Sequence, residues 1–188
     1  MEIFDDIQKE SIVKVKSNLI SKVNGKLLDF PIGLESLIRN RGVLSGGSIS
    51  STFWEETPND YDIYLTDDSD IDVFKSLMKE PQYWQLITDV NEKYMNTLVD
   101  GKLVTANATT FKNGIQVITM SNITQRLNFD FIHCMPWLKL DTNTFYISKE
   151  QYASIVKKVL VVNPNYKLQL SDKRISKYTE RGWRFYNT

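Results

Sequence analysis

The sequence has 188 residues, of which 41% are hydrophobic and 24% charged, and its 23 lysines and arginines balance 23 aspartates and glutamates. This length and apolar content fit one folded domain and exclude a disordered chain, and no apolar run is long enough to span a membrane. The single cysteine, Cys134, excludes a disulfide framework and a cysteine-based zinc site. We therefore expect a protein of the reducing cytoplasm, with no membrane partner.

The balanced charge is unevenly distributed along the chain. Residues 55–72 contain eight acidic and no basic residues, whereas residues 149–188 contain nine basic and three acidic residues. Zero net charge gives no overall basic field that would attract nucleic acid. The two charged segments indicate either a functional pairing of opposite charges or ordinary solvated surface.

The N-terminal half alternates between helical and strand-like patterns. Apolar residues at helical spacing predict a helix over residues 2–23, which Asn24 and Gly25 are expected to end. The elements expected next are a helix over 34–40, a strand over 43–44, a helical turn over 48–54, a strand over 60–65, and helices over 69–79 and 81–94.

The C-terminal half begins with a hairpin signal. Asn113-Gly114 separates the β-rich segments 102–110 and 115–120, and this dipeptide is typical of hairpin turns. The elements expected after it are a strand over 127–134 and helices over 148–160 and 171–182. The whole pattern predicts one α/β (α+β) domain over residues 1–188, in which helices flank a short mixed sheet. Residues 1–40 form its helical N-terminal segment and residues 148–188 its basic helical C-terminal segment.

A glycine turn follows the first expected strand. Gly46 and Gly47 allow close backbone approach and positive φ, so that successive N–H groups can converge on an anion. A helix starting at Ser48 would add its N-terminal partial charge and a hydroxyl donor. Together these three residues predict a cradle for a triphosphate, although a glycine pair by itself is more often an ordinary turn.

Carboxylates occur at strand positions where they can share a face. Asp60 and Asp62 are two residues apart on an expected strand, so both side chains point to one face, where Mg²⁺ would relieve their repulsion. Asp130 is flanked by phenylalanines on another expected strand and is the candidate third ligand. Asp100 and Asp141 remain alternatives for this third position.

These residues together resemble a known family. Gly47-Ser48, eleven further residues, Asp60-x-Asp62 and a later strand with one aspartate are similar to the nucleotidyltransferase superfamily that includes DNA polymerase beta. Within it, the chain most resembles the head domains of tRNA CCA-adding enzymes and poly(A) polymerases. The resemblance covers residues 42–65 and 106–137.

This resemblance implies a two-metal transfer of a nucleoside monophosphate from an NTP to an acceptor hydroxyl, with release of pyrophosphate. Asp60 and Asp62 would bind both Mg²⁺ ions, and Asp130 would bind the ion that activates the acceptor. Gly46, Gly47 and Ser48 would hold the β and γ phosphates. An RNA 3′ end is the expected acceptor. A small molecule or a protein is the alternative, and a non-catalytic module that binds nucleotide or nucleic acid is the rival of another class.

The expected C-terminal helix carries basic residues on one face. Arg174, Lys177 and Arg181 are spaced three or four residues apart and would contact the triphosphate or an RNA backbone if this face meets the acidic site. If it faces water, it is a solvated surface. His133, the only histidine, is expected to be a structural, hydrogen-bonded residue rather than a base, and Cys134 a small buried filler.

Overall fold

The computed structural model describes residues 3–99, 102–121 and 129–186, with the backbone alone over 93–105. The helices are α1 (Asp6–Leu27), α2 (Ile32–Arg41), α3 (Gly47–Phe53), α4 (Asp68–Leu77), α5 (Pro81–Trp84), the 3₁₀ helix η2 (Ile132–Cys134), α6 (Lys149–Lys157) and α7 (Asp172–Thr179). The strands are β1 (Val43–Ser45), β2 (Tyr61–Leu65), β3 (Ile87–Val99), β4 (Lys102–Phe111), β5 (Ile115–Thr119), β6 (Trp137–Lys139), β7 (Thr144–Tyr146), β8 (Val159–Leu160) and β9 (Arg184–Phe185).

Seven of these strands form one mixed sheet in the order β3-β4-β5-β2-β1-β6-β7. Strands β2 and β5 are parallel, and the other neighbouring pairs in this sheet are antiparallel. Strands β8 and β9 form a separate parallel pair. The expected α/β architecture, a mixed sheet flanked by helices, is therefore confirmed.

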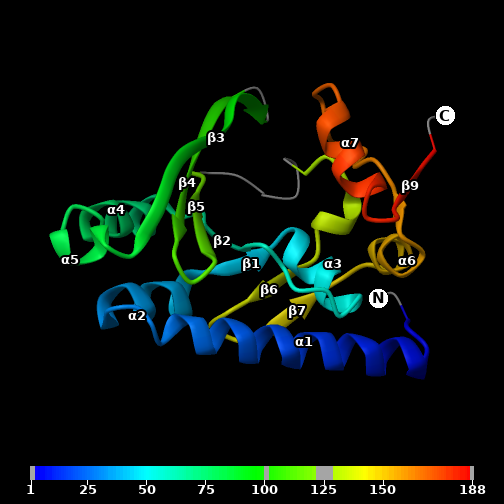
Figure 1. Cartoon of the computed structure of the whole chain (residues 1–188), viewed down its shortest axis with the longest axis horizontal. Coiled ribbons are helices and arrows are strands. Elements are labelled where there is room, and N and C mark those ends of the chain that lie inside the picture. The colour runs from blue at the N-terminus through cyan, green and yellow to red at the C-terminus, as the bar shows by residue number, and fades with distance from the viewer. Residues whose placement is uncertain (1–2, 100–101, 122–128, 187–188) are drawn as a thin grey trace.

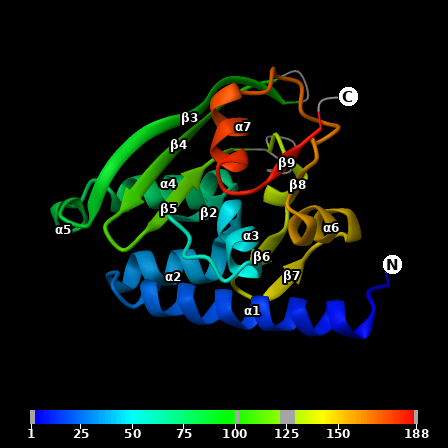
Figure 2. The same cartoon turned by 45° about the vertical axis from the view of Figure 1, so that its right-hand side comes forward.

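Each face of the sheet has its own hydrophobic cluster. Ile63 and Leu65 of β2 pack in the first cluster, with buried residues of α1, α2 and α4, whereas Tyr64 packs in the second, with residues of η2, α6 and α7. This division follows from the alternation of side chains along a strand. In both views α1 lies on one side of the sheet and α7 on the other (Figures 1 and 2).

The first helix lies four residues further along the chain than the sequence predicts, at the same length of 22 residues. Asn24 and Gly25 do not end α1, which continues to Leu27. Val23 and Leu27 are both fully buried, so the apolar stripe of the helix continues past the glycine. Burial of one further turn outweighs the intrinsic cost of a glycine in a helix, about 1 kcal/mol.

The expected helix over 81–94 is wrong after Trp84. Helix α5 ends at Trp84, and β3 begins at Ile87 and pairs with β4 in a long antiparallel hairpin. Ile87, Thr88 and Val90 are β-branched, so cross-strand pairing prevails over an apolar spacing that also fits a helix. The hairpin predicted at Asn113-Gly114 joins β4 and β5 as expected.

The expected strand over 127–134 is also different in the structure. Residues 122–128 lie outside the described part of the chain; after them, Phe131 forms a single bridge with Val162, and η2 follows at once. The sequence does not predict the strands β6, β7, β8 and β9. Each has only two or three residues, too few for hydrophobic alternation to be visible in the sequence.

Candidate active site

A cavity of about 310 Å³ opens between the start of α3, the start of β2 and one face of α7. Eight of the residues singled out in the sequence line it: Gly46, Gly47, Ser48, Asp60, Asp62, Arg174, Lys177 and Arg181. The other lining residues are Ser51, Pro58, Asn59, Phe129, Cys134 and Tyr178. The acidic segment and the basic C-terminal helix therefore meet at one cavity.

The glycine turn between β1 and α3 forms one wall of the cavity. Gly46 has φ 93° and ψ −161°, a conformation that is essentially restricted to glycine. Its N–H donates to the carbonyl oxygen of Cys134 over 3.0 Å, which fixes the turn against η2. A Cβ atom at Gly46 would lie 3.0 Å from Oδ2 of Asp62, so the turn packs directly against this carboxylate.

We expect Gly46→Ala to destabilise the protein by roughly 1–3 kcal/mol, because alanine is strained at this φ and its methyl group contacts Asp62. Gly47→Ala is the matched control, since a Cβ there meets no atom within 4 Å and alanine suits a helix. Urea unfolding of the two variants measures the difference. Equal effects of the two substitutions would contradict this explanation of the turn.

Ser48 adds a polar group to the same wall. It is 3% exposed, and its Oγ forms no hydrogen bond within the described part of the chain. A buried hydroxyl without a partner is costly, and a ligand oxygen in the cavity would satisfy it.

Two carboxylates lie at the start of β2. Asp60 is exposed and directly precedes the strand, while Asp62 is half-buried within it and lies opposite Ser45 of β1 and Gln116 of β5. Both strand neighbours of Asp62 are therefore uncharged. The pair presents two oxygen ligands to one cavity, which is the donor chemistry that Mg²⁺ prefers.

Helix α7 and the turn that follows it supply the basic wall, and the cations of this wall differ in their partners. Arg174 pairs with Asp130. Arg181 donates to Glu56 over 2.9 Å and to Ser51 Oγ over 3.3 Å. Lys177 is exposed and has no acidic partner among the described residues, so it is the lining cation most available to an anionic ligand.

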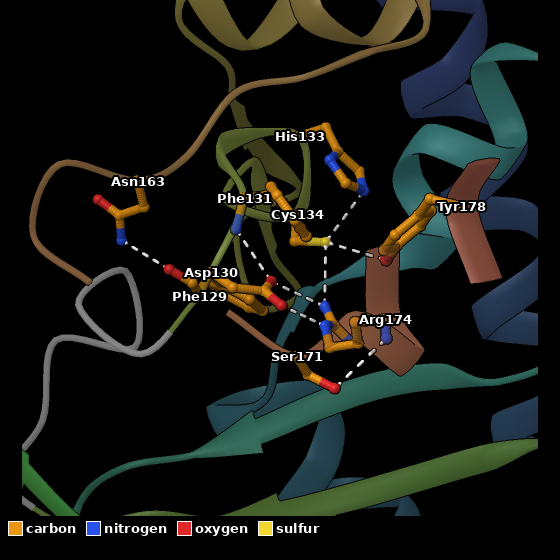
Figure 3. Close-up of polar contacts among 9 residues, drawn as sticks. All are labelled: Phe129, Asp130, Phe131, His133, Cys134, Asn163, Ser171, Arg174 and Tyr178. Atoms are coloured by element: carbon orange, nitrogen blue, oxygen red, sulfur yellow. Dashed lines mark hydrogen bonds and ion pairs between the residues drawn. The ribbon is translucent and has the colours of Figure 1, made fainter. Parts of the chain in front are cut away.

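The structure does not bring Asp130 together with Asp60 and Asp62. Asp130 is 5% exposed and does not line the cavity. Its carboxylate accepts hydrogen bonds from the N–H of Phe131 and from Nε and Nη2 of Arg174 (Figure 3). The expectation that it lies on a regular strand is wrong, and the backbone that carries it is instead fixed by the N–H of Asn163, which donates to the Asp130 carbonyl over 2.7 Å.

The alternatives for a third carboxylate do not complete the group either. Asp141 lies beside Lys139, with 3.5 Å between Oδ2 and Nζ, and does not line the cavity. Asp100 lies outside the described residues. Over residues 3–99, 102–121 and 129–186, no three His, Cys, Asp or Glu side chains are grouped so as to hold a metal ion.

Beneath the cavity lies a buried aromatic cluster that contains the only histidine. His133 is fully buried, and its Nε2 lies within hydrogen-bond distance of Sγ of Cys134, 3.3 Å away. The rings of Trp183 and Tyr178 have their centroids 4.3 and 4.6 Å from the imidazole. Burial, and then the charges of two arginines, lower the pKa of His133 to about 3, and burial raises the pKa of Cys134 to about 11. Both groups are therefore uncharged at neutral pH.

The lowered pKa of His133 makes stability depend on pH. Between its ordinary pKa of 6.5 and about 3, the unfolded chain binds a proton that the folded protein does not. The free energy of unfolding is therefore expected to fall by about 1.4 kcal/mol per pH unit below pH 6.5 through this group alone. Urea unfolding at several pH values should show a shallower pH dependence in His133→Phe, because carboxylates act equally in both proteins. An identical pH dependence of the unfolding free energy in the two proteins would contradict the lowered pKa of His133.

Sequence reasoning misses Glu56. This residue accepts hydrogen bonds from Arg181 and from Lys158, each over 2.9 Å, and Lys158 also lies over the ring of Trp54. It thereby ties the segment before Asp60 to α6 and α7. The only signal in the sequence is its place in the acidic run, which does not distinguish a half-buried ion pair from solvated surface.

Solved structures of CCA-adding enzymes share this fold. A CCA-adding enzyme in complex with ATP aligns with the whole chain at 17% identity and a TM-score of 0.53, over 43% of that enzyme. The Thermotoga maritima CCA-adding enzyme complexed with tRNA aligns with 88% of the chain at 14% identity and a TM-score of 0.52, over 42% of that enzyme. The protein therefore has the nucleotidyltransferase-like fold that its sequence resembles. It spans less than half the length of these enzymes.

The chain also matches the model of one protein family. Residues 7–158 match the model of the Gabija anti-defense 2 (Gad2) family proteins. Since the match covers most of the chain, the protein belongs to this family. No curated protein matches the sequence significantly. None of the helices that the structure describes is long and apolar enough to cross a bilayer.

Proposed function

We propose that this protein is a Mg²⁺-dependent nucleotidyltransferase that moves a nucleoside monophosphate from an NTP to an acceptor hydroxyl. The observation that carries the proposal is the composition of the cavity. Two carboxylates, Asp60 and Asp62, share it with the glycine turn, the Ser48 hydroxyl and the basic face of α7. Carboxylates for a cation beside donors for phosphates are the groups that phosphoryl-type transfer requires.

The residues present fit Mg²⁺. Asp60 and Asp62 would hold it, since this ion is usually bound by one or two carboxylates together with substrate phosphates and water. When bound, it would neutralise charge on the phosphate oxygens and orient them. With no third carboxylate grouped beside this pair in the described residues, a second ion would depend on phosphate and water for its other ligands.

The chain's own residues would position the NTP while the bond to the acceptor forms and the bond to pyrophosphate breaks. Ser48 and Lys177 would contact phosphate oxygens, and Arg174 would contact them with its remaining N–H groups. The acceptor oxygen bonds to the α-phosphorus, the bond from that phosphorus to the bridging β-phosphate oxygen breaks, and pyrophosphate leaves. The hydroxyl proton passes to solvent beside the exposed Asp60. Fixed geometry and charge would supply most of the rate enhancement.

An RNA 3′ end is the acceptor that we favour. Support comes from the fold shared with a CCA-adding enzyme that was solved with tRNA, and from the basic segment over residues 149–188. A small molecule or a protein is the alternative acceptor, because this chain corresponds to only 42% of that enzyme.

A non-catalytic nucleotide-binding module is the second candidate. One observation favours it: Asp130 is bound to Arg174 rather than grouped with Asp60 and Asp62. Such a module would bind NTP without releasing pyrophosphate.

The family name suggests the biological setting. We infer that nucleotidyl transfer by this protein counteracts Gabija defence. Cells protected by Gabija should lose protection when they express the wild-type protein and keep it when they express Asp60→Asn/Asp62→Asn. Equal loss of protection with both proteins would separate the anti-defence role from transfer.

The experiment that tests the proposed function is transfer of label from each of the four α-³²P NTPs, with Mg²⁺, to total RNA and to protein. Label on RNA that is absent with the double variant supports both transfer and the favoured acceptor. Label on protein supports transfer to the alternative acceptor. If no label transfers while Mg²⁺ and NTP still raise the melting temperature, a small-molecule acceptor or the binding module is favoured. If no label is transferred and Mg²⁺ with NTP does not raise the melting temperature, the proposal is wrong.

A further inference from the structure

The buried pair of Asp130 and Arg174 joins two segments that are 44 residues apart. Both carboxylate oxygens of Asp130 accept from the guanidinium, one from Nε and the other from Nη2 at 2.9 Å, in a bidentate arrangement. The Asp130 side chain is 6% exposed and that of Arg174 is 41% exposed. The carboxylate is thus enclosed and paired with the guanidinium (Figure 3), while Arg174 also lines the cavity.

The partners of Asp130 argue against a role as metal ligand. Oδ1 already accepts from the N–H of Phe131, 2.9 Å away, as well as from Arg174. A cation bound by Asp130 would either lie beside the positive charge of the guanidinium or displace it, and a displaced guanidinium would remain partly buried without compensation, which is costly.

Arg174 lines the cavity and has N–H groups that its pairing with Asp130 leaves unused. Nη1 donates no hydrogen bond within the described residues, whereas Nε and Nη2 are used by Asp130. The guanidinium also lies over the ring of Tyr178, with 5.6 Å between Cζ and the centroid. A guanidinium held in this way loses little freedom when it binds phosphate.

We propose that Asp130 is a positioning residue, which holds Arg174 so that its free N–H groups bind the phosphates of the nucleotide, and that it does not bind metal. The proposal rests on the proposed function for the identity of the ligand. Asp130 would then raise the affinity for phosphate only by holding Arg174 in place.

Calorimetric titration with inorganic tripolyphosphate, in EDTA and again with Mn²⁺, tests this assignment. Asp130→Asn and Arg174→Gln are each expected to lower the affinity roughly tenfold or more, through loss of a charge-assisted contact. The losses should be similar with and without Mn²⁺. Arg184→Gln, a basic residue outside the cavity, is the control and should keep wild-type affinity.

The double variant Asp130→Asn/Arg174→Gln removes both charges of the pair and so leaves neither charge without its partner. It therefore tests the proposal even if Asp130→Asn alone does not fold. It should bind tripolyphosphate as Arg174→Gln does, with or without Mn²⁺. A merely structural role would lower the affinity further in this background, and a metal-binding role would lower it further only with Mn²⁺. Either result overturns the proposal. Two further results would also overturn it: an unchanged affinity of Asp130→Asn for tripolyphosphate, and no binding of tripolyphosphate by the wild-type protein. None of these measurements requires turnover, so failure of the proposed transfer reaction is detected separately.

Discussion

Replacement of Asp60 and Asp62 together by asparagine is expected to lower nucleotidyl transfer by roughly 100-fold or more while the protein stays folded. The two carboxylates are the only acidic side chains that line the cavity in the described part of the chain. Without them Mg²⁺ would not be held beside the phosphates to compensate their charge, and loss of comparable electrostatic groups in enzymes costs about 10²–10³ in rate. The initial rate of label transfer from an α-³²P NTP, measured with Mg²⁺, gives the effect.

A second double variant tests whether the effect requires carboxylates that line the cavity or follows from the loss of any two carboxylates. Asp67→Asn/Asp68→Asn removes two exposed carboxylates that do not line the cavity, so it should keep the wild-type rate. Circular dichroism and the melting temperature establish that both proteins are folded. Comparable rates for the two double variants would exclude Asp60 and Asp62 from the reaction.

Phe131→Ala is expected to cost roughly 3–5 kcal/mol of unfolding free energy, the largest effect on stability that we expect from one substitution. Phe131 is fully buried, and its ring packs against those of His133, Tyr178 and Phe185, with centroids 5.9–6.2 Å away. Its loss leaves a cavity next to the Asp130–Arg174 pair.

Urea unfolding followed by tryptophan fluorescence measures this effect. Tyr186→Ala is the control, because Tyr186 is 58% exposed and a surface truncation normally changes stability by less than about 0.5 kcal/mol. A loss below about 1 kcal/mol in Phe131→Ala would show that the aromatic cluster does not hold this side of the sheet together.

The parts of the site that could be predicted from the sequence are those built from short local patterns. Two glycines before Ser48 predict a turn, and the alternation around Asp60 and Asp62 predicts a strand that presents both carboxylates on one side. The cavity in the structure is lined by all five of these residues. The capping residues Ser148 and Ser171 likewise mark the starts of α6 and α7, because capping involves only neighbouring residues.

The parts that could not be predicted depend on contacts between distant segments. The pairing of Asp130 with Arg174 is decided by how α7 packs against η2, and no local pattern encodes it. The same holds for Glu56, whose partners lie 102 and 125 residues further along the chain. The first part of β3 has an apolar spacing that predicts a helix, but its pairing with β4 determines its conformation.

Nucleotidyl transfer leaves the α-phosphate on the acceptor, so the decisive measurement compares ATP labelled at the α position with ATP labelled at the γ position. With Mg²⁺ and total RNA, we expect the α label to remain on the acceptor and the γ label to be released as pyrophosphate. The γ label on the acceptor would indicate a kinase, and its release as inorganic phosphate a simple nucleotidase. Either of these results would contradict nucleotidyl transfer by this protein.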